Sequence, residues 1–305
     1  MSVPRAVRAR AFAPGHITGI FAPVTDARDP RARGSSGAGV VLELGVIATA
    51  EFRPGGRSTV RVSGDGSAPL PISTEVARRL RPKVPGLLTV RLEHQLPIGQ
   101  GFGMSAAGAC ATALAVGAVA HRSRRTALEV AHLADLFGGG GLGGVASIVG
   151  GGGLEFRMTG GLPPRGIVRH QALSGHVWAG VVGGPMLSPR LLRSDRFLER
   201  VRDASEELGP LLRAPSDERF FSASERFTDR LDLAPPALRR TISELRRRDC
   251  WAAQAMFGRS FFARARGPRA RAETIAWLQR ARVPAVEIAA ARQGPRVTTS
   301  HVAGS

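Results

Sequence analysis

A glycine-dense segment that leads straight into a helix of small residues is the feature that most constrains this chain. The segment spans Leu96 to Gly108 and reads LPIGQGFGMSAAG. Glycines allow backbone N–H groups to turn inward, and a helix N-terminus adds unpaired donors and a partial positive charge. The segment therefore predicts a phosphate cradle, in which the Ser105 hydroxyl holds a phosphate oxygen or a magnesium ion.

Two common classes of glycine loop do not fit the sequence. A Walker A loop needs a lysine that reaches the β- and γ-phosphates, and the single lysine, Lys83, lies in the unrelated context RPKVP. Because Lys83 is the single lysine, the chain also lacks the strand lysine that a protein kinase needs. A Rossmann strand feeds its glycines directly, whereas residues 93–97 separate the predicted strand Leu87–Leu92 from this loop.

The remaining pattern, P-x-G-x-G-[LF]-G-x-S-A, resembles the second motif of the GHMP kinases. Residues 11–21 (AFAPGHITGIF) and 33–42 (RGSSGAGVVL) are similar to the opening of the archaeal pantoate kinases within that superfamily. Residues 141–145 (GLGGV) stand where the family has G-L-G-D-V, and residues 256–262 (MFGRSFF) resemble its third motif. The resemblance spans most of the chain and is least specific between about 190 and 249.

The resemblance implies an α+β fold of two domains. The first, at 1–162, would be like ribosomal protein S5 domain 2, and the second, at 163–305, would be ferredoxin-like; the glycine- and proline-rich residues 160–164 mark the boundary. Hydrophobic periodicity alone predicts only an α+β chain with strands at 3–12, 40–52, 57–62, 87–92, 177–182, 283–289 and 296–301, and helices at 72–81, 105–121, 127–137, about 189–208, 218–231, 236–256 and 270–281.

Local signals add three details to this pattern. Ser73 is expected to cap the helix at 72–81, and the strand at 57–62 to form a hairpin with the strand before it. The residues Pro14, Gly15 and His16 are expected to form a turn.

The resemblance also implies ATP and Mg²⁺ as the nucleotide and its metal. It assigns ATP binding to Pro97, Gly99, Gly101, Gly103, Met104, Ser105 and Ala106. Ser105 and Asp135 would bind the metal and act in catalysis. Asp135 stands where the family carries a glutamate, and the shorter side chain keeps the charge.

One position departs from the family pattern. Gly144 replaces the aspartate that the family uses to orient or deprotonate the substrate hydroxyl. General-base help contributes about 10² to 10⁴ in rate, and a loose phosphoryl transition state asks little of a base. Two hypotheses stay open: a kinase that works by positioning and magnesium, or a GHMP-fold regulatory or binding module that binds nucleotide without turnover.

For the acceptor, the resemblance implies (R)-pantoate, phosphorylated on its primary hydroxyl to (R)-4-phosphopantoate in coenzyme A biosynthesis. A carboxylate substrate needs a cation, and Arg157 stands where the family has an arginine. The predicted substrate-binding residues are His16, Thr18, Ser36, Arg157, Gly258 and Ser260.

Composition limits the partners of the chain. The net charge is +19, but the arginines are scattered and there is no tyrosine, which favours solvated faces over a specific nucleic-acid site. Two distant cysteines predict a reduced, cytoplasmic protein. The uncharged residues 102–120 begin with the glycine loop, which favours a buried helix over a membrane span. The expected partner is a small molecule, and a homodimer is left open.

Overall fold

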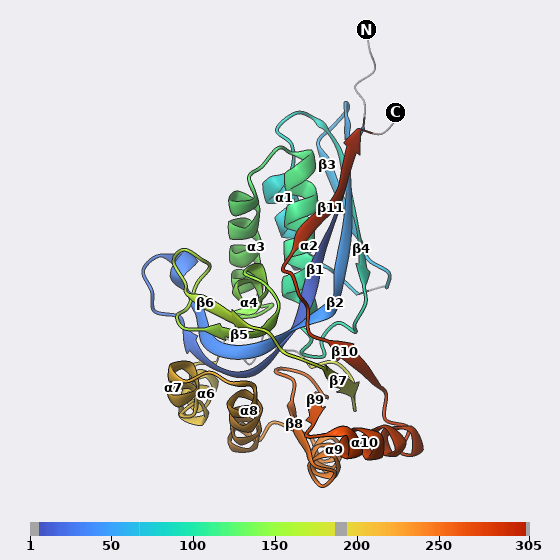
Figure 1. The fold of residues 1–305 in the computed structure, drawn as a ribbon. Coiled ribbons are helices and arrows are strands. Elements are labelled where there is room, and N and C mark those ends of the chain that lie inside the picture. Colours follow the sequence, from blue (N-terminus) through green and yellow to red (C-terminus); the bar gives the residue numbers. More distant parts are fainter. Residues whose placement is uncertain (1–5, 67, 187–193, 303–305) are drawn as a thin grey trace.

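The computed structural model describes residues 6–66, 68–186 and 194–302. Within them, strands form a seven-stranded and a four-stranded sheet, placed end to end (Figure 1). In the larger sheet the order is β11-β1-β2-β4-β3, and β5 pairs with β2 and β6. The bounds are β1 Val7–Val24, β2 Gly34–Pro54, β3 Thr59–Ser63, β4 Gly86–His94, β5 Gly153–Arg157, β6 Val168–Gln171 and β11 Arg296–Val302.

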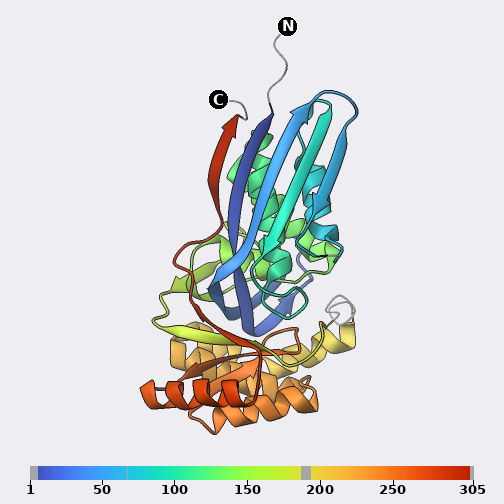
Figure 2. The same cartoon turned by 90° about the vertical axis from the view of Figure 1, so that its right-hand side faces the viewer.

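Helices cover one face of the larger sheet. They are α1 (Pro71–Leu80), α2 (Met104–Val119), α3 (Arg124–Gly138) and the short α4 (Gly144–Val149), and Figure 2 shows the opposite face of the long strands without a helix. The small residues of α2 are buried on nearly every side, which is expected for a central helix that is apolar all round. No helix in the described part of the chain is long and apolar enough to cross a membrane.

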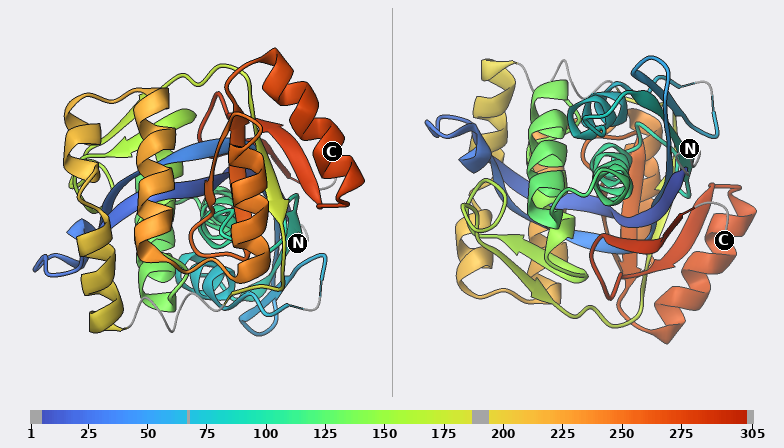
Figure 3. Two further views of the ribbon diagram at one scale, coloured as in Figure 1. Left: turned by 90° about the horizontal axis from the view of Figure 1, so that it is seen from below. Right: turned by 90° about the horizontal axis from the view of Figure 1, so that it is seen from above.

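The smaller sheet has the strand order β10-β7-β9-β8. Counted along the chain this is 4-1-3-2, the arrangement of a ferredoxin-like fold, so the predicted α+β fold is confirmed. Seen from below, the helices of this part of the chain lie in front of the strands (Figure 3), and α6 and α7 contact β1 of the larger sheet. The bounds are β7 His176–Val181, β8 Cys250–Gln254, β9 Ser260–Ala265, β10 Ala285–Ala289, α6 Asp195–Ala204, α7 Leu208–Arg213, α8 Asp217–Leu231, α9 Pro236–Arg246 and α10 Pro268–Arg280.

Helix α8 joins the two sheets because it packs on both β1 and β8. The ring centroid of Phe227 lies 5.8 Å from that of Phe21 on β1, in an edge-on arrangement. Phe220 stacks at 6.1 Å on Phe262 of β9. These buried rings make one continuous apolar core across both sheets.

The predicted division at 162/163 does not separate the two sheets. Strand β6 lies beyond it and pairs with β5, and β11 returns from the C-terminal end to pair with β1, with Val7 opposite Val302. The C-terminal strand thus completes the larger sheet, and both ends of the described chain lie side by side (Figure 1).

Three local predictions are corrected by tertiary pairing. The expected turn at Pro14 is part of the continuous strand β1, which changes register between Pro14 and Gly15. Strand β3 pairs in parallel with β4, not in a hairpin with β2; the alternating buried residues of β4 suit an interior strand, and the largely exposed β3 suits an edge. Ser73 lies inside α1, which begins with Pro71.

The predicted helix at 236–256 ends early. Helix α9 stops at Arg246, and Cys250–Gln254 forms strand β8. Asp249, with φ at 56°, turns the chain between them. The reason is burial, since Ala252 and Ala253 pack within the smaller sheet.

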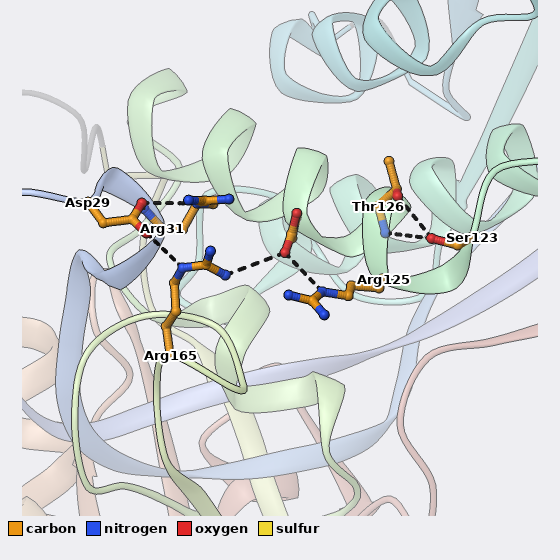
Figure 4. Close-up of polar contacts among 7 residues, drawn as sticks. Asp29, Arg31, Ser123, Arg125, Thr126 and Arg165 are labelled. Atoms are coloured by element: carbon orange, nitrogen blue, oxygen red, sulfur yellow. Dashed lines mark hydrogen bonds and ion pairs between the residues drawn. The ribbon is translucent and has the colours of Figure 1, made fainter.

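A chain of ion pairs fastens the connection after β1 to α3 (Figure 4). Asp29 pairs with Arg31 and Arg165, and Glu129 of α3 pairs with Arg165 and Arg125. Asp29 also caps the short 3₁₀ helix η1 (Pro30–Ala32). Such partly exposed pairs contribute little individually, but they hold this connection beside the start of α3.

The packing of α8 gives a direct test of how the sheets are joined. Phe227→Ala removes a fully buried ring, and we expect the free energy of unfolding to fall by about 3–5 kcal/mol. Phe137→Ala is the matched control because that ring is 57% exposed, and its effect should be small. Guanidinium unfolding measures both, and equal effects would contradict the packing described.

Candidate active site

One cavity collects most of the residues that the sequence singled out. Its wall combines residues of β1 and β2, both glycine-rich segments, the start of α2, Asp135 of α3 and the turn between β8 and β9. The lining residues are His16, Thr18, Phe21, Ser35, Gly99, Gly101, Phe102, Gly103, Met104, Ser105, Ala106, Asp135, Gly140, Gly141, Leu142, Gly143, Gly144, Met256 and Phe257.

The first glycine loop leaves backbone donors open at the start of α2. Gly99, Gly101 and Gly103 have φ values of +75°, +75° and +71°, a region that favours glycine. Gly103 is the N-cap residue, and no side chain of the described residues caps the helix. Successive N–H groups at such a turn and helix start form an anion-binding concavity.

The smaller sheet holds this loop in place. Ser260 of β9 donates a hydrogen bond to the carbonyl oxygen of Gln100, and the Gln100 amide donates to the Gly183 carbonyl at 2.8 Å. A Cβ atom on Gly101 would lie 2.7 Å from the carbonyl oxygen of Ala255. The loop can therefore approach the second sheet this closely only with glycine at that position.

Ser105 and Asp135 meet at the helix end of the cavity. The Ser105 hydroxyl donates to Asp135 Oδ1 at 2.7 Å. Asp135 is 2% exposed, and burial raises the pKa of its carboxyl to about 7, against a smaller opposing effect of the serine hydrogen bond. A Cβ atom on Gly140 would collide with both groups. The second glycine loop thus closes over the pair.

A buried polar cluster lies behind the cavity wall. Glu155 and Arg157 of β5 form an ion pair, and Arg157 also donates to Ser147 of α4. The Ser147 hydroxyl donates in turn to the Gly143 carbonyl at 2.8 Å. His16 Nε2 lies 2.9 Å from Glu155 Oε1. The cluster therefore ties β1, β5 and the second glycine loop to one another.

The predicted nucleotide residues fall into two groups. Gly99, Gly101, Gly103, Met104, Ser105 and Ala106 line the cavity, whereas Pro97 is exposed outside it. Pro97 precedes the part of the loop that turns inward, so its side chain makes no part of the cradle.

The predicted substrate residues are only partly brought together. His16 and Thr18 line the cavity. Ser36 does not, because neighbours on a strand face opposite sides; its hydroxyl is directed to the Ala22 carbonyl and Ser35 lines the cavity instead. Gly258 and Ser260 pack on Gln100 and support the loop.

Arg157, which was predicted to bind the substrate carboxylate, does not line the cavity. It is 1% exposed and is occupied by Glu155 and Ser147. A Cβ atom on Gly143 would lie 2.8 Å from Arg157 Nε, so the guanidinium sits directly behind a glycine of the wall. In this geometry it positions the second glycine loop.

Several residues in and behind the cavity wall were not predicted from the sequence. Glu155 and Ser35 are buried polar residues within strands, and the apolar wall includes Phe21 and Phe257. Two glycines within strand β2 could have indicated buried side chains on its neighbour. Gly37 and Gly39 stand opposite Arg157 and Glu155 and leave room for those side chains.

Gly144 also lines the cavity, and its lack of a side chain matches its surroundings. A Cβ atom there would lie 2.6 Å from the Cβ atom of Ala106 and 3.7 Å from Asp135 Oδ2. An aspartate at 144 would require Ala106 to move and would place a second carboxylate beside the first.

Comparisons with known proteins agree with this geometry. The model for the GHMP kinases N terminal domain matches residues 72–152. The pantoate kinase of Thermococcus kodakarensis is 31% identical over 245 residues, which cover 77% of this chain and 80% of that protein. The pantoate kinase of Methanospirillum hungatei is 30% identical over 275 residues, covering 88% and 90%.

A solved structure extends the likeness to three dimensions. A phosphotransferase related to the coenzyme A biosynthesis pathway superposes with a TM-score of 0.84 at 27% identity, covering 95% of this chain and 98% of the other. The fold and the glycine-loop cavity thus define a kinase of the GHMP class. Within that class, the identity to the two curated relatives over most of their length shows that the chain belongs to the pantoate kinase family.

The raised pKa of Asp135 predicts how stability changes with pH. The folded state holds this proton more tightly than the unfolded chain, whose carboxyl titrates near 3.8. The stabilisation from the protonated group is complete below pH 3.8 and is lost as pH rises to about 7. Asp135→Asn should therefore gain stability over the wild type, on the order of 4 kcal/mol between pH 4 and pH 8.

Urea unfolding at a series of pH values measures this difference. Asp203→Asn is the matched control, because Asp203 lies exposed on α6. A pH-independent difference between Asp135→Asn and the wild type would show that the carboxyl is not held protonated.

Proposed function

We propose that this protein transfers the γ-phosphoryl group of ATP to the primary hydroxyl of (R)-pantoate, giving (R)-4-phosphopantoate for coenzyme A biosynthesis. The observation that carries the proposal is a cavity that brings together an uncapped helix N-terminus and the Ser105–Asp135 pair. Family membership supplies the acceptor.

Phosphate binding follows from the first glycine loop. Its inward-turned backbone and the start of α2 offer N–H donors to the phosphate oxygens, and the helix dipole favours their negative charge. A triphosphate there would place its terminal group near Ser105.

The residues present fit a magnesium ion that arrives with the nucleotide. Mg²⁺ in kinases is commonly held by one or two carboxylates together with phosphates and water. Asp135 offers a carboxylate and Ser105 a hydroxyl, 2.7 Å apart. No group of three or more His, Cys, Asp or Glu among the described residues could hold a metal without the nucleotide. The ion, when bound, neutralises charge that develops on the transferring group.

A second hollow beside the loop suits the nucleoside. It shares Met104 and Ser105 with the main cavity and has an apolar wall that includes Leu70, Ile72 and Ile98. This position would place the base in the second hollow and the terminal phosphate in the main cavity, where the acceptor would lie.

The acceptor cavity offers matching chemistry. Pantoate carries two hydroxyls and a carboxylate around a carbon with two methyl groups. Phe21, Leu142 and Phe257 would pack against the methyl groups, and Thr18 and Ser35 would donate hydrogen bonds to its oxygens. Arg157 contributes by holding Gly143 in place through Ser147.

The alternative, a GHMP-fold module without turnover, has no observation in its favour. The glycine-loop cradle and the Ser105–Asp135 pair are both present despite Gly144. We further propose a cytoplasmic enzyme without a specific nucleic-acid partner, supported by two free cysteines and by arginines paired with acids across the surface. A homodimer remains a prediction.

Turnover tests the function directly. Phosphorus-31 NMR with magnesium, ATP and (R)-pantoate should show a new phosphomonoester. Ser105→Ala should lower kcat/KM by about 10- to 100-fold, and Asp135→Asn by about 100-fold or more, because each removes a ligand of the phosphate-bound metal.

Ser222→Ala on α8 and Asp203→Asn on α6 are the matched controls, since neither residue lines the cavity. They should retain wild-type rates. Wild-type protein that forms no phosphomonoester from pantoate while binding Mg–ATP would overturn the proposed function.

The nucleoside hollow makes a separate prediction. Ile98→Ala shortens an apolar side chain of the hollow and should raise the KM for ATP by about 3- to 10-fold, with little change in the KM for pantoate. Val84→Ala, at another exposed apolar residue outside the hollow, is the control. Steady-state kinetics with each substrate varied separates the two constants, and an unchanged KM for ATP would place the nucleoside elsewhere.

A further inference from the structure

The cavity wall holds two titratable side chains. Among the described lining residues these are His16 and Asp135. Asp135 is engaged with Ser105 at the helix end, where the phosphates and their metal would lie. His16 stands on β1 and is the group left to face the acceptor.

The backbone fixes His16 beside the phosphate cradle. Its N–H donates to the Phe102 carbonyl oxygen at 3.0 Å. A Cβ atom on Gly103 would lie 2.7 Å from the His16 carbonyl oxygen, so the loop and the strand are in close contact. A group on the His16 ring is therefore near the site that the terminal phosphate would occupy.

Glu155 sets the tautomer of the His16 ring. An ionised carboxylate can only accept a hydrogen bond, so Nε2 carries the hydrogen that is donated to Oε1 across 2.9 Å. This leaves Nδ1 unprotonated and able to accept a proton. The residue is 3% exposed and lines the cavity that would hold the acceptor.

The charges around the ring keep this arrangement. Burial alone raises the pKa of Glu155, but the Arg157 charge and the His16 hydrogen bond outweigh it and hold the pKa below its usual value. Burial lowers the pKa of His16, against the opposing effect of Glu155, and the charges of Arg157 and His170 also lower it. The pair at neutral pH is an ionised glutamate with a neutral imidazole.

We propose that His16 is the general base of the phosphoryl transfer and that Glu155 is its positioning residue. This inference rests on the proposed function. His16 Nδ1 takes the proton of the acceptor hydroxyl as its oxygen attacks the γ-phosphorus. The bond between that phosphorus and the oxygen bridging to the β-phosphate breaks, and its electron pair leaves on ADP. The imidazolium that forms is stabilised by the Glu155 carboxylate.

His16→Gln tests the base while keeping the link to Glu155. The glutamine amide can still donate a hydrogen bond to Glu155, but it offers no basic nitrogen. We expect kcat to fall by about 10²- to 10⁴-fold with the KM for ATP unchanged. The limb of the pH–kcat profile that reports protonation of His16 at low pH should also disappear, a change that a purely structural role would not produce.

His132→Gln is the matched control, since it makes the same substitution at another buried histidine that does not line the cavity. It should keep the wild-type profile. In His16→Ala, added imidazole should restore turnover in proportion to its unprotonated form. Thermal unfolding of every variant checks that the fold is retained.

The outcomes separate this inference from the function on which it rests. A folded His16→Gln protein with kcat within 10-fold of the wild type and the same pH limb would overturn the role of His16 alone. Wild-type protein that binds Mg–ATP and forms no phosphopantoate would overturn the proposed function, and this inference with it.

Discussion

The close approach of the first glycine loop to both sheets is the constraint on which the rest of the site depends. The loop must present its N–H groups to the cavity while its other side touches Ala255 and His16. Only residues without a side chain allow both, and three of them adopt positive φ. Gln100 and Ser260 then fix the loop with hydrogen bonds. The helix start, and with it the polar end of the cavity, is therefore positioned by contacts from the second sheet.

Two buried acids divide the electrostatic work of the site. Among the described residues the Asp135 carboxyl is hydrogen-bonded to the neutral hydroxyl of Ser105, and burial raises its pKa. With no cationic side chain paired to it there, this carboxyl is available to a cation that binds with the nucleotide. Glu155 already faces Arg157, which keeps it ionised and unavailable to a metal. The same side-chain chemistry thus serves a ligand in one place and a neighbouring histidine in the other.

The cavity also explains how the chain accommodates glycine at 144. Ala106 occupies the space that a larger residue at 144 would need, and the carboxylate of Asp135 lies nearby. Proton acceptance in the proposed mechanism then moves to β1, where His16 already contacts the phosphate loop. Gly144 then contributes only backbone to the cavity wall, and the proposed base, His16, comes from β1.

The sequence by itself determined the glycine loop, the buried helix after it and the α+β class, because these rest on local spacing and on motifs of adjacent residues. Asp135 became a candidate only through the resemblance to the family, and the structure brings it within hydrogen-bond distance of Ser105. Only the tertiary structure decided that Ser35, and not Ser36, lines the cavity. It also decided that Arg157 forms an ion pair with Glu155 and that β11 pairs with β1. Strand parity, the partner of a buried charge and the return of a distant strand depend on which segments lie side by side. That information belongs to packing over long sequence separations, and no local pattern carries it.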